Sequence, residues 1–154
     1  MKSSFFRICS ILAISLVVSL QTLQAQQKTL DGVWDVTVTV TNCDTGALIR
    51  TVRSLQAFHH DGSVTETANT AARGISEGVW APVGEQNFTA SYWFFRYQPD
   101  GAFASFAKIT DNIHLVAAGE LTSTGVVQDF DANGTLISTG CFVHAAYRLA
   151  GSEE

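Results

Sequence analysis

Valine and threonine alternate along residues 36–41 of this chain, so that Val36, Val38 and Val40 share one face of an extended segment. A period of two in β-branched residues predicts a half-buried strand. Trp34 shares the valine face, and we expect it to point into the core. Comparable strand-like runs follow at residues 51–59, 63–69, 78–82 and 87–97.

Short turn sequences separate these runs. They lie at residues 42–46, 60–62, 83–86, 98–101, 111–112, 123–125 and 131–134, and several contain Asp-Gly or Asn-Gly. These pairs supply the positive φ of hairpin turns. No sustained helical periodicity follows residue 25, so we expect an all-β fold, a single antiparallel up-and-down β-barrel of eight to nine strands. Residues 70–77 are the least strand-like. They predict a rim loop or a single helical turn, either an ordinary connection or a mobile lid.

The first 25 residues have the layout of a secretory signal peptide. Lys2 and Arg7 give a basic start, residues 8–20 are mostly apolar, and Ala25 offers a small residue before the expected cleavage. The apolar run is shorter than the roughly 20 residues that span a bilayer. We therefore predict a signal peptide at 1–25, one barrel domain at 26–154, and a secreted or periplasmic protein. The residue directly after the expected cleavage site is Gln26 and not a cysteine, so we expect no lipoprotein membrane anchor.

Charge narrows the choice of partner. The leader carries two of the nine basic residues and none of the fourteen acidic ones, so the remaining chain has a net charge of −7. Phosphate backbones and anionic lipids repel such a chain. Nucleic acid and membrane surfaces are accordingly not expected partners.

Two cysteines remain after export, Cys43 and Cys141. An even count in an exported chain favours a disulfide. The first and last strands of a closed antiparallel barrel are neighbours, so this pair can meet. Two free thiols, or two ligands of a metal, are the alternatives.

Gly32 and Trp34 open the first predicted strand, and Arg148 lies in the last. The pattern resembles lipocalin-type (calycin) barrels, which begin with Gly-x-Trp and place a cation across the tryptophan ring. The resemblance implies structural roles for these three residues. The chain also resembles small exported bacterial proteins related to the allene oxide cyclase barrel, at residues 42–43, 58–62, 78–80, 94–96 and 139–141. That likeness implies an eight-stranded barrel with an apolar pocket, in a family of carriers of small hydrophobic molecules and a few cyclases.

Five of the six residues at 92–97 are aromatic. In a strand, Tyr92, Phe94 and Arg96 face one way, and the other three residues face the opposite way. One face must fill the barrel, either as simple core packing or as the wall of an apolar ligand pocket with a few polar groups. The predicted ligand-binding residues are Trp80, Tyr92, Phe94, Arg96 and Phe106.

Candidates for acid–base chemistry are Glu66, Tyr92 and His144. A carboxyl buried among apolar groups has a raised pKa and can transfer a proton. A solvated, outward-facing side chain is the alternative for each acid. The chain has no Gly-x-Ser-x-Gly elbow and no glycine-rich phosphate loop. The spacing of the four histidines fits no metal motif, so we expect neither a metal nor a cofactor.

Together these features predict an exported barrel that binds a small hydrophobic molecule in its lumen. Two alternatives stay open. One is a barrel cyclase or isomerase acting on a small apolar substrate. The other is a structural or interaction domain whose barrel is packed shut. The sequence does not decide between a binding protein and an enzyme, and it leaves the oligomeric state open.

Overall fold

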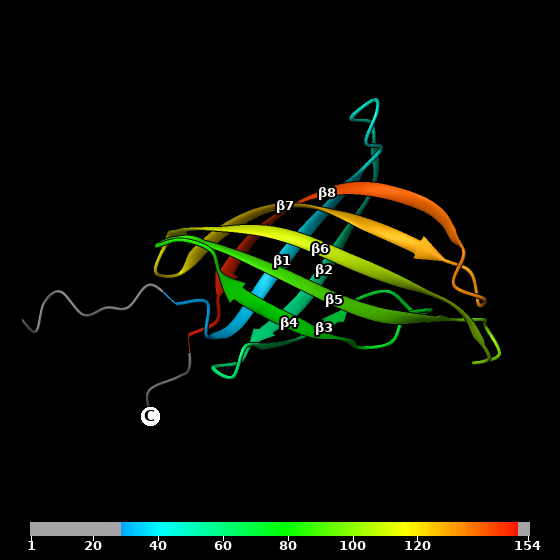
Figure 1. Ribbon diagram of the computed structural model, residues 1–154, viewed down its shortest axis with the longest axis horizontal. Coiled ribbons are helices and arrows are strands. Elements are labelled where there is room, and N and C mark those ends of the chain that lie inside the picture. Colours follow the sequence, from blue (N-terminus) through cyan, green and yellow to red (C-terminus); the bar gives the residue numbers. More distant parts are fainter. Residues whose placement is uncertain (1–28, 151–154) are drawn as a thin grey trace, which may run out of the picture.

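The computed structural model describes residues 29–150, which form a closed barrel of eight antiparallel strands, each paired with its neighbours in the chain (Figure 1). The strands are β1 (Gly32–Thr41), β2 (Leu48–Phe58), β3 (Ser63–Ala68), β4 (Ser76–Pro82), β5 (Asn87–Tyr97), β6 (Phe103–Ala117), β7 (Glu120–Phe130) and β8 (Leu136–Arg148). The predicted up-and-down barrel is confirmed, with eight strands. The predicted signal peptide lies outside the described residues.

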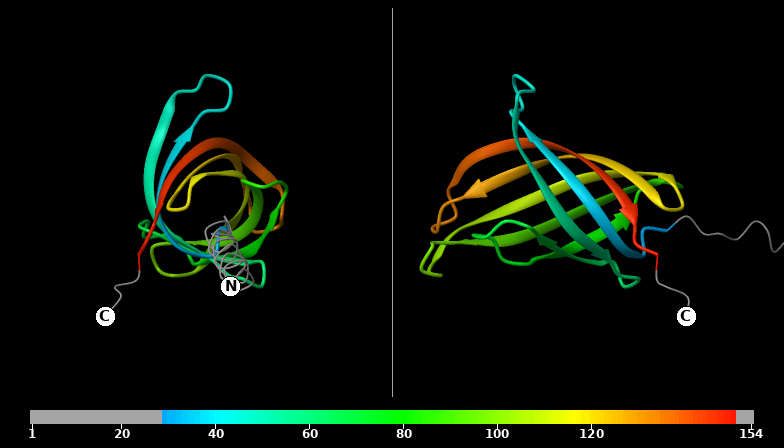
Figure 2. Two further views of the ribbon diagram at one scale, coloured as in Figure 1. Left: turned by 90° about the vertical axis from the view of Figure 1, so that its left-hand side faces the viewer. Right: turned by 180° about the vertical axis from the view of Figure 1, so that it is seen from behind.

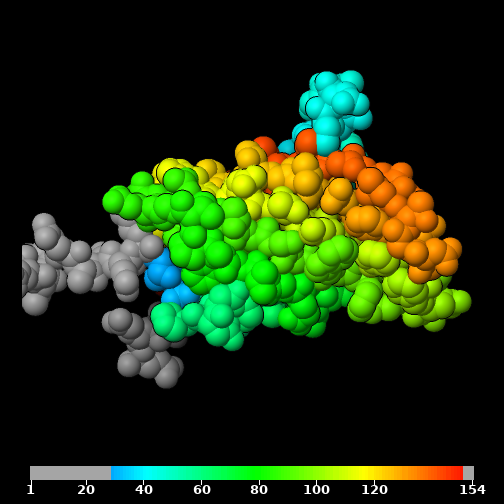
Figure 3. All heavy atoms as spheres, in the orientation of Figure 1, coloured from blue at the N-terminus to red at the C-terminus, as the bar shows by residue number. Residues whose placement is uncertain are grey.

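Two of the predicted turns are wrong. Residues 111–112 lie inside β6 and residues 123–125 lie inside β7, and the chain reverses between these strands at Ala118 and Gly119 instead. The other turns fall where their sequences predict. At the β2–β3 turn Gly62 has a φ of 84°, which an L side chain rarely adopts. The β1–β2 hairpin projects from the barrel as a knob (Figure 3).

The barrel has two different ends. Both described termini lie at one of them, here called the terminal end, together with the β2–β3, β4–β5 and β6–β7 turns (Figure 1). The opposite end holds Arg50, Arg73 and Arg96, which line one pocket there, and is called the arginine end. Seen along its axis, the strands surround a central lumen (Figure 2).

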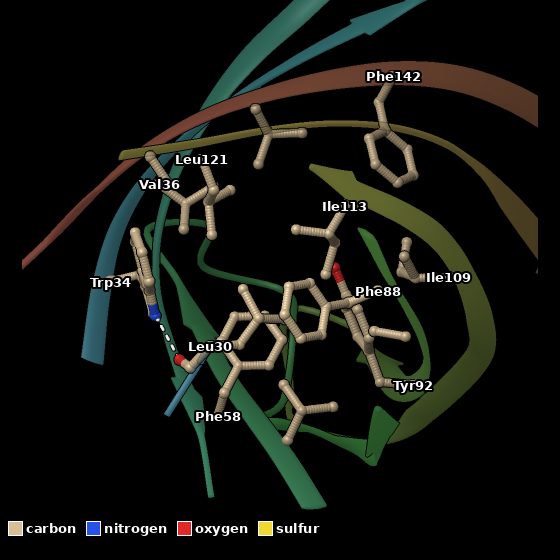
Figure 4. Close-up of a cluster of buried hydrophobic side chains, with 14 of the residues drawn as sticks. Leu30, Trp34, Val36, Phe58, Phe88, Tyr92, Ile109, Ile113, Leu121 and Phe142 are labelled. Carbon is tan, nitrogen blue, oxygen red and sulfur yellow. Dashed lines mark hydrogen bonds between the residues drawn. The ribbon is translucent and has the colours of Figure 1, made fainter. Parts of the chain in front are cut away.

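Pairing of β1 with β8 closes the barrel, from Trp34 opposite Arg148 to Thr41 opposite Cys141. The Arg148 guanidinium lies 4.5 Å from the centroid of the Trp34 ring. It also donates to the backbone carbonyls of Thr29 and Asp31, which ties the N-terminal segment to the barrel. Trp34 Nε1 donates to the Leu30 carbonyl at 2.8 Å (Figure 4). Because Leu30 and Trp34 are fully buried, the terminal end is filled.

Alternate residues of each strand point inward and build the core. On β1 these are Trp34, Val36, Val38 and Val40, as the valine pattern predicts. Phe58, Phe88, Tyr92, Ile113, Leu121 and Phe142 come from the other strands and meet them in the lumen (Figure 4). In the described part of the chain, no helix is long and apolar enough to cross a membrane.

Gly78 lets β4 approach β5 closely. A Cβ on Gly78 would lie 2.2 Å from the Ser91 carbonyl oxygen and 2.4 Å from Tyr92 Cα. Backbone atoms cannot move aside cheaply, so Gly78→Ala should lower the free energy of unfolding by about 1–3 kcal/mol. Urea unfolding measures this loss. Gly119→Ala is the matched control, since nothing lies within 4 Å of its added Cβ. Equal stability of the two variants would contradict the steric argument.

Candidate functional site

A small cavity in the lumen brings the three predicted acid–base residues, Glu66, Tyr92 and His144, to one place. Its remaining walls are mainly apolar and include Val38, Val40, Val52, Phe94, Ile109, Val127 and Phe142. In Figure 4, Tyr92, Ile109 and Phe142 point into this space from three different strands. Its volume is about 30 Å³. That is room for about one water molecule, so the middle of the lumen is nearly filled.

Glu66 is held in a buried ion pair by Arg73. Both side chains are nearly enclosed, with 3% and 11% of their surface exposed. Ser76 Oγ donates to Glu66 Oε2 at 2.8 Å, and Arg73 Nη2 donates to Ser76 Oγ at 2.7 Å. The Arg73 guanidinium also lies 3.7 Å from the centroid of the Phe94 ring. Arg73 and Ser76 both engage Glu66 Oε2, so the Glu66 carboxylate belongs to an ion pair that holds the Arg73 side chain in the barrel.

Arg73 comes from the segment at 70–77, which the sequence predicts to be a rim loop or a single helical turn. The structure has a turn and an isolated bridge between Arg73 and Arg96 there, followed by β4 from Ser76. The Gly74 N–H donates to the Phe95 carbonyl at 2.9 Å, and the Tyr97 N–H donates to the Ala72 carbonyl at 2.9 Å. These two hydrogen bonds hold the segment against β5. Arg73 lies between the inner cavity and the pocket at the arginine end.

Tyr92 is a neutral phenol within the cavity. Its hydroxyl accepts a hydrogen bond from Gln56 Nε2 at 3.0 Å. Burial, followed by the nearby carboxylates Glu66 and Asp111, raises the pKa of Tyr92 well above its ordinary value of 10. The hydroxyl keeps its proton at every ordinary pH as a result.

Asp111 and His144 form a second buried acid–base pair. His144 Nδ1 lies 3.3 Å from Asp111 Oδ2, and the two side chains are 3% and 1% exposed. Neither oxygen of Asp111 nor Nδ1 of His144 makes a hydrogen bond within the described residues. Ser54 and Ser123 bury unpartnered hydroxyls as well. Each such group costs about 1–3 kcal/mol unless water or a ligand pairs with it.

A larger pocket of about 480 Å³ opens at the arginine end. It is lined by Val52, Ala71, Ala72, Tyr97 and Ala104, by Thr70 and Ser105, and by the three arginines. Arg73 is paired with Glu66, and Arg96 Nε donates to Asp129 Oδ1 at 2.9 Å. Within residues 29–150, Arg50 makes no ion pair. Arg50, Val52 and Arg73 line both this pocket and the inner cavity, so the two spaces adjoin.

The predicted ligand-binding residues do not form one site. Tyr92 and Phe94 line the inner cavity, and Arg96 lines the pocket at the arginine end. Trp80 points inward at the other end of the barrel, where it packs against Phe58 and Phe88. Phe106 lies outside the barrel, stacked on Phe130 with ring centroids 5.1 Å apart, and its assignment to the lumen is wrong.

Phe106 belongs to an aromatic outer face. Its members are Trp93, Phe95, Phe103, Phe106 and Phe130, which contact one another across β5, β6 and β7. Trp93, Phe95 and Phe103 are 42%, 54% and 47% exposed. Apolar residues gathered in this way on a surface are typical of contact sites for other molecules.

Sequence reasoning missed Arg50, Gln56, Arg73 and Asp111. Asp111 carries a signal that could have found it. It is in phase with Ala107, Ile109, Ile113 and Leu115, which form the buried face of β6. A charged residue in register with an apolar face indicates a buried functional group or a buried ion pair.

Comparison with known proteins adds little to this description. No family model matches the chain, and no curated protein matches it. Among solved structures, it is similar to the S-type phycobiliprotein lyase CPES from Guillardia theta, with 11% sequence identity and a TM-score of 0.43. The match covers 80% of this chain and 90% of that chain. A likeness of this degree carries no argument about function. The closed eight-stranded barrel and the contact of Arg148 with Trp34 are as expected from the resemblance of Gly32, Trp34 and Arg148 to the lipocalin-type pattern.

Proposed function

We propose that this barrel binds a small, mainly apolar molecule that carries an acidic group. The acid would lie among the arginines of the arginine end, and the apolar part would extend toward the lumen. The observation that carries the proposal is the pocket of about 480 Å³ with both apolar and cationic walls. Small-molecule sites have volumes of about 300–1,000 Å³ and combine apolar walls with a few polar groups.

The inner cavity supports the same proposal. Its lining residue His144 buries an unpartnered Nδ1, and the neighbouring Asp111 buries two carboxylate oxygens that also make no hydrogen bond within residues 29–150. A core selected only for packing would place apolar side chains at these positions. Arg73 lines both spaces together with Arg50 and Val52, and we infer that a swing of the Arg73 side chain toward solvent widens the passage between them.

We also propose that the protein is exported, by cleavage of residues 1–25, to a periplasmic or extracellular location. The disulfide between Cys43 and Cys141 supports this, since such bonds persist in oxidising compartments.

Binding is tested by titrating the ¹⁵N-labelled protein with nonanoate and, separately, with 1-nonanol. We expect saturable shifts of the amides of Val52, Ala71, Ala72 and Ser105, with tighter binding of the acid. Arg50→Gln should weaken nonanoate binding about fivefold, because a partly solvated charge contact contributes about 1 kcal/mol. Binding of 1-nonanol should not change.

Arg53→Gln is the matched control. It removes the same charge from the same strand, but Arg53 points outward and pairs with Asp35. If Arg50→Gln and Arg53→Gln weaken nonanoate binding equally, the effect comes from the net charge of the protein and not from a contact with Arg50. Absence of saturable binding by either ligand would overturn the proposal. Shifts confined to the aromatic outer face would favour a second candidate function, a surface for interaction with another protein.

A further inference from the structure

Asp111 and His144 are a buried acid–base pair that ligand binding alone does not explain. They come from different strands, β6 and β8, and meet in the lumen with Oδ2 and Nδ1 3.3 Å apart. An ionisable pair in an apolar interior is costly to the fold, and replacing it with apolar residues is often neutral or stabilising. The cost of burying this pair therefore favours a catalytic role for it.

The geometry fixes which nitrogen of His144 is available. The imidazole stacks on Phe142, with ring centroids 4.4 Å apart and planes at 20°. Nδ1 faces Asp111, so Nε2 is the nitrogen left for the cavity that His144 lines. A carboxylate close to one imidazole nitrogen favours the tautomer with the proton on that nitrogen, which leaves the other nitrogen as a base, and it stabilises the imidazolium that forms.

Tyr92 offers the complementary group in the same cavity. Its oxygen accepts from Gln56, and its own proton has no acceptor within residues 29–150. The hydroxyl is buried, and in Figure 4 it points toward the middle of the lumen. A fixed donor in a dry site stabilises negative charge that develops on an oxygen.

We propose that this cavity is a proton-transfer site for small enolisable carbonyl compounds, with His144 as the base, Tyr92 as the donor to the carbonyl oxygen and Asp111 as the positioning residue. The proposal rests on the proposed function, since the substrate must first bind at the arginine end. A cavity of about 30 Å³ holds about one water molecule, so the carbonyl end of such a molecule enters when the Arg73 side chain moves aside, which favours a chain with a ketone at one end and an acid at the other.

The step needs no further reactant. His144 Nε2 takes a proton from the carbon next to the carbonyl, and the C–H electron pair forms a carbon–carbon double bond. The electron pair of the carbonyl moves onto oxygen, which accepts a hydrogen bond from Tyr92. Return of a proton from His144 to the same carbon regenerates the ketone. Where the substrate carries a neighbouring double bond, return at the far carbon shifts that double bond.

Deuterium exchange tests the proposal. The oxidised protein is incubated in D₂O with 8-oxononanoate, and loss of the protons next to the ketone is followed by NMR. We expect exchange above the buffer rate. His144→Gln should lower it about 100-fold or more, as for loss of a general base. Tyr92→Phe should lower it about 100-fold, as for loss of one oxyanion donor. Tyr147→Phe, which removes a phenol hydroxyl from the outer face of β8, is the matched control and should exchange like the wild type.

Binding of nonanoate is measured on every variant, so that loss of fold or of binding is separated from loss of proton transfer. For Asp111→Asn we expect slower exchange together with a change in the ¹⁵N shifts of His144, which report its tautomer. Wild-type protein that binds 8-oxononanoate without exchanging its protons would overturn this inference and leave the proposed function standing. Failure to bind either acid would overturn both. An equal loss of exchange in Tyr147→Phe would also overturn the assignment of roles.

Discussion

Replacing Cys43 and Cys141 by alanine is expected to lower the free energy of unfolding by about 4–5 kcal/mol, the chain-entropy value for a loop of this length. The bond joins residues 98 positions apart. It links the turn after β1 to β8, beside the strand pair that closes the barrel. A loss of this size is a large part of the roughly 5–15 kcal/mol that stabilises a typical domain.

Urea unfolding followed by tryptophan fluorescence, to which the buried Trp34 contributes, measures the effect. Reduction of the disulfide in the wild-type protein should produce the same loss of stability. This control separates the effect of losing the disulfide from the effect of replacing the two side chains. A loss below about 1 kcal/mol would contradict the prediction. It would mean that the β1–β8 hydrogen bonds and the contact of Arg148 with Trp34 are enough to close the barrel.

The closure itself could be predicted from the sequence. The alternation at residues 36–41 sets which face of β1 is buried, and the pattern of Gly32, Trp34 and Arg148 places the first strand beside the last. The predicted export and the even count of cysteines after residue 25 favour the disulfide, and the structure confirms the disulfide. These inferences succeed because each depends on local periodicity, or on one pairing that a closed barrel requires.

The turns at residues 111–112 and 123–125 were predicted wrongly for a physical reason. Asp, Asn, Ser and Gly favour turns, but the same residue types also serve inside a barrel. Asp111 is a lumenal acid, and Gly125 accommodates the Phe142 ring, whose Cζ would lie 2.4 Å from an added Cβ. Only the partner strands distinguish these roles, and a single sequence does not contain the pairing.

The candidate site was predicted in part for a similar reason. Glu66, Tyr92 and His144 stand out as chemistry-bearing residues, yet their convergence depends on the register of β3, β5 and β8. The hydrophobic periodicity of the strands does not predict the role of Arg73, because Arg73 lies in the connection between β3 and β4. Its side chain points into the lumen, where it forms an ion pair with Glu66. Phe106 was misplaced because β5 and β6 carry aromatic residues on their outer face as well.

Breaking the ion pair between Glu66 and Arg73 is the second large effect that we expect. Glu66→Gln keeps the size and most hydrogen bonds of the side chain, but it leaves the Arg73 guanidinium buried without a counter-charge. Removing one partner of a buried pair costs about 3–5 kcal/mol. Because 11% of the Arg73 side chain is exposed, we expect a loss near the lower value, about 3 kcal/mol, measured by urea unfolding.

A double-mutant cycle with Arg73→Gln is the control. If the uncompensated charge causes the loss, the double variant should be more stable than Glu66→Gln alone, because it buries two neutral amides. Arg73→Gln should also strengthen 1-nonanol binding, since a neutral side chain between the two spaces leaves the lumen more easily. A loss below about 1 kcal/mol in Glu66→Gln would contradict a tightly held pair. It would show that Arg73 already leaves the lumen in solution, and that the inner cavity is open to the arginine end without a ligand.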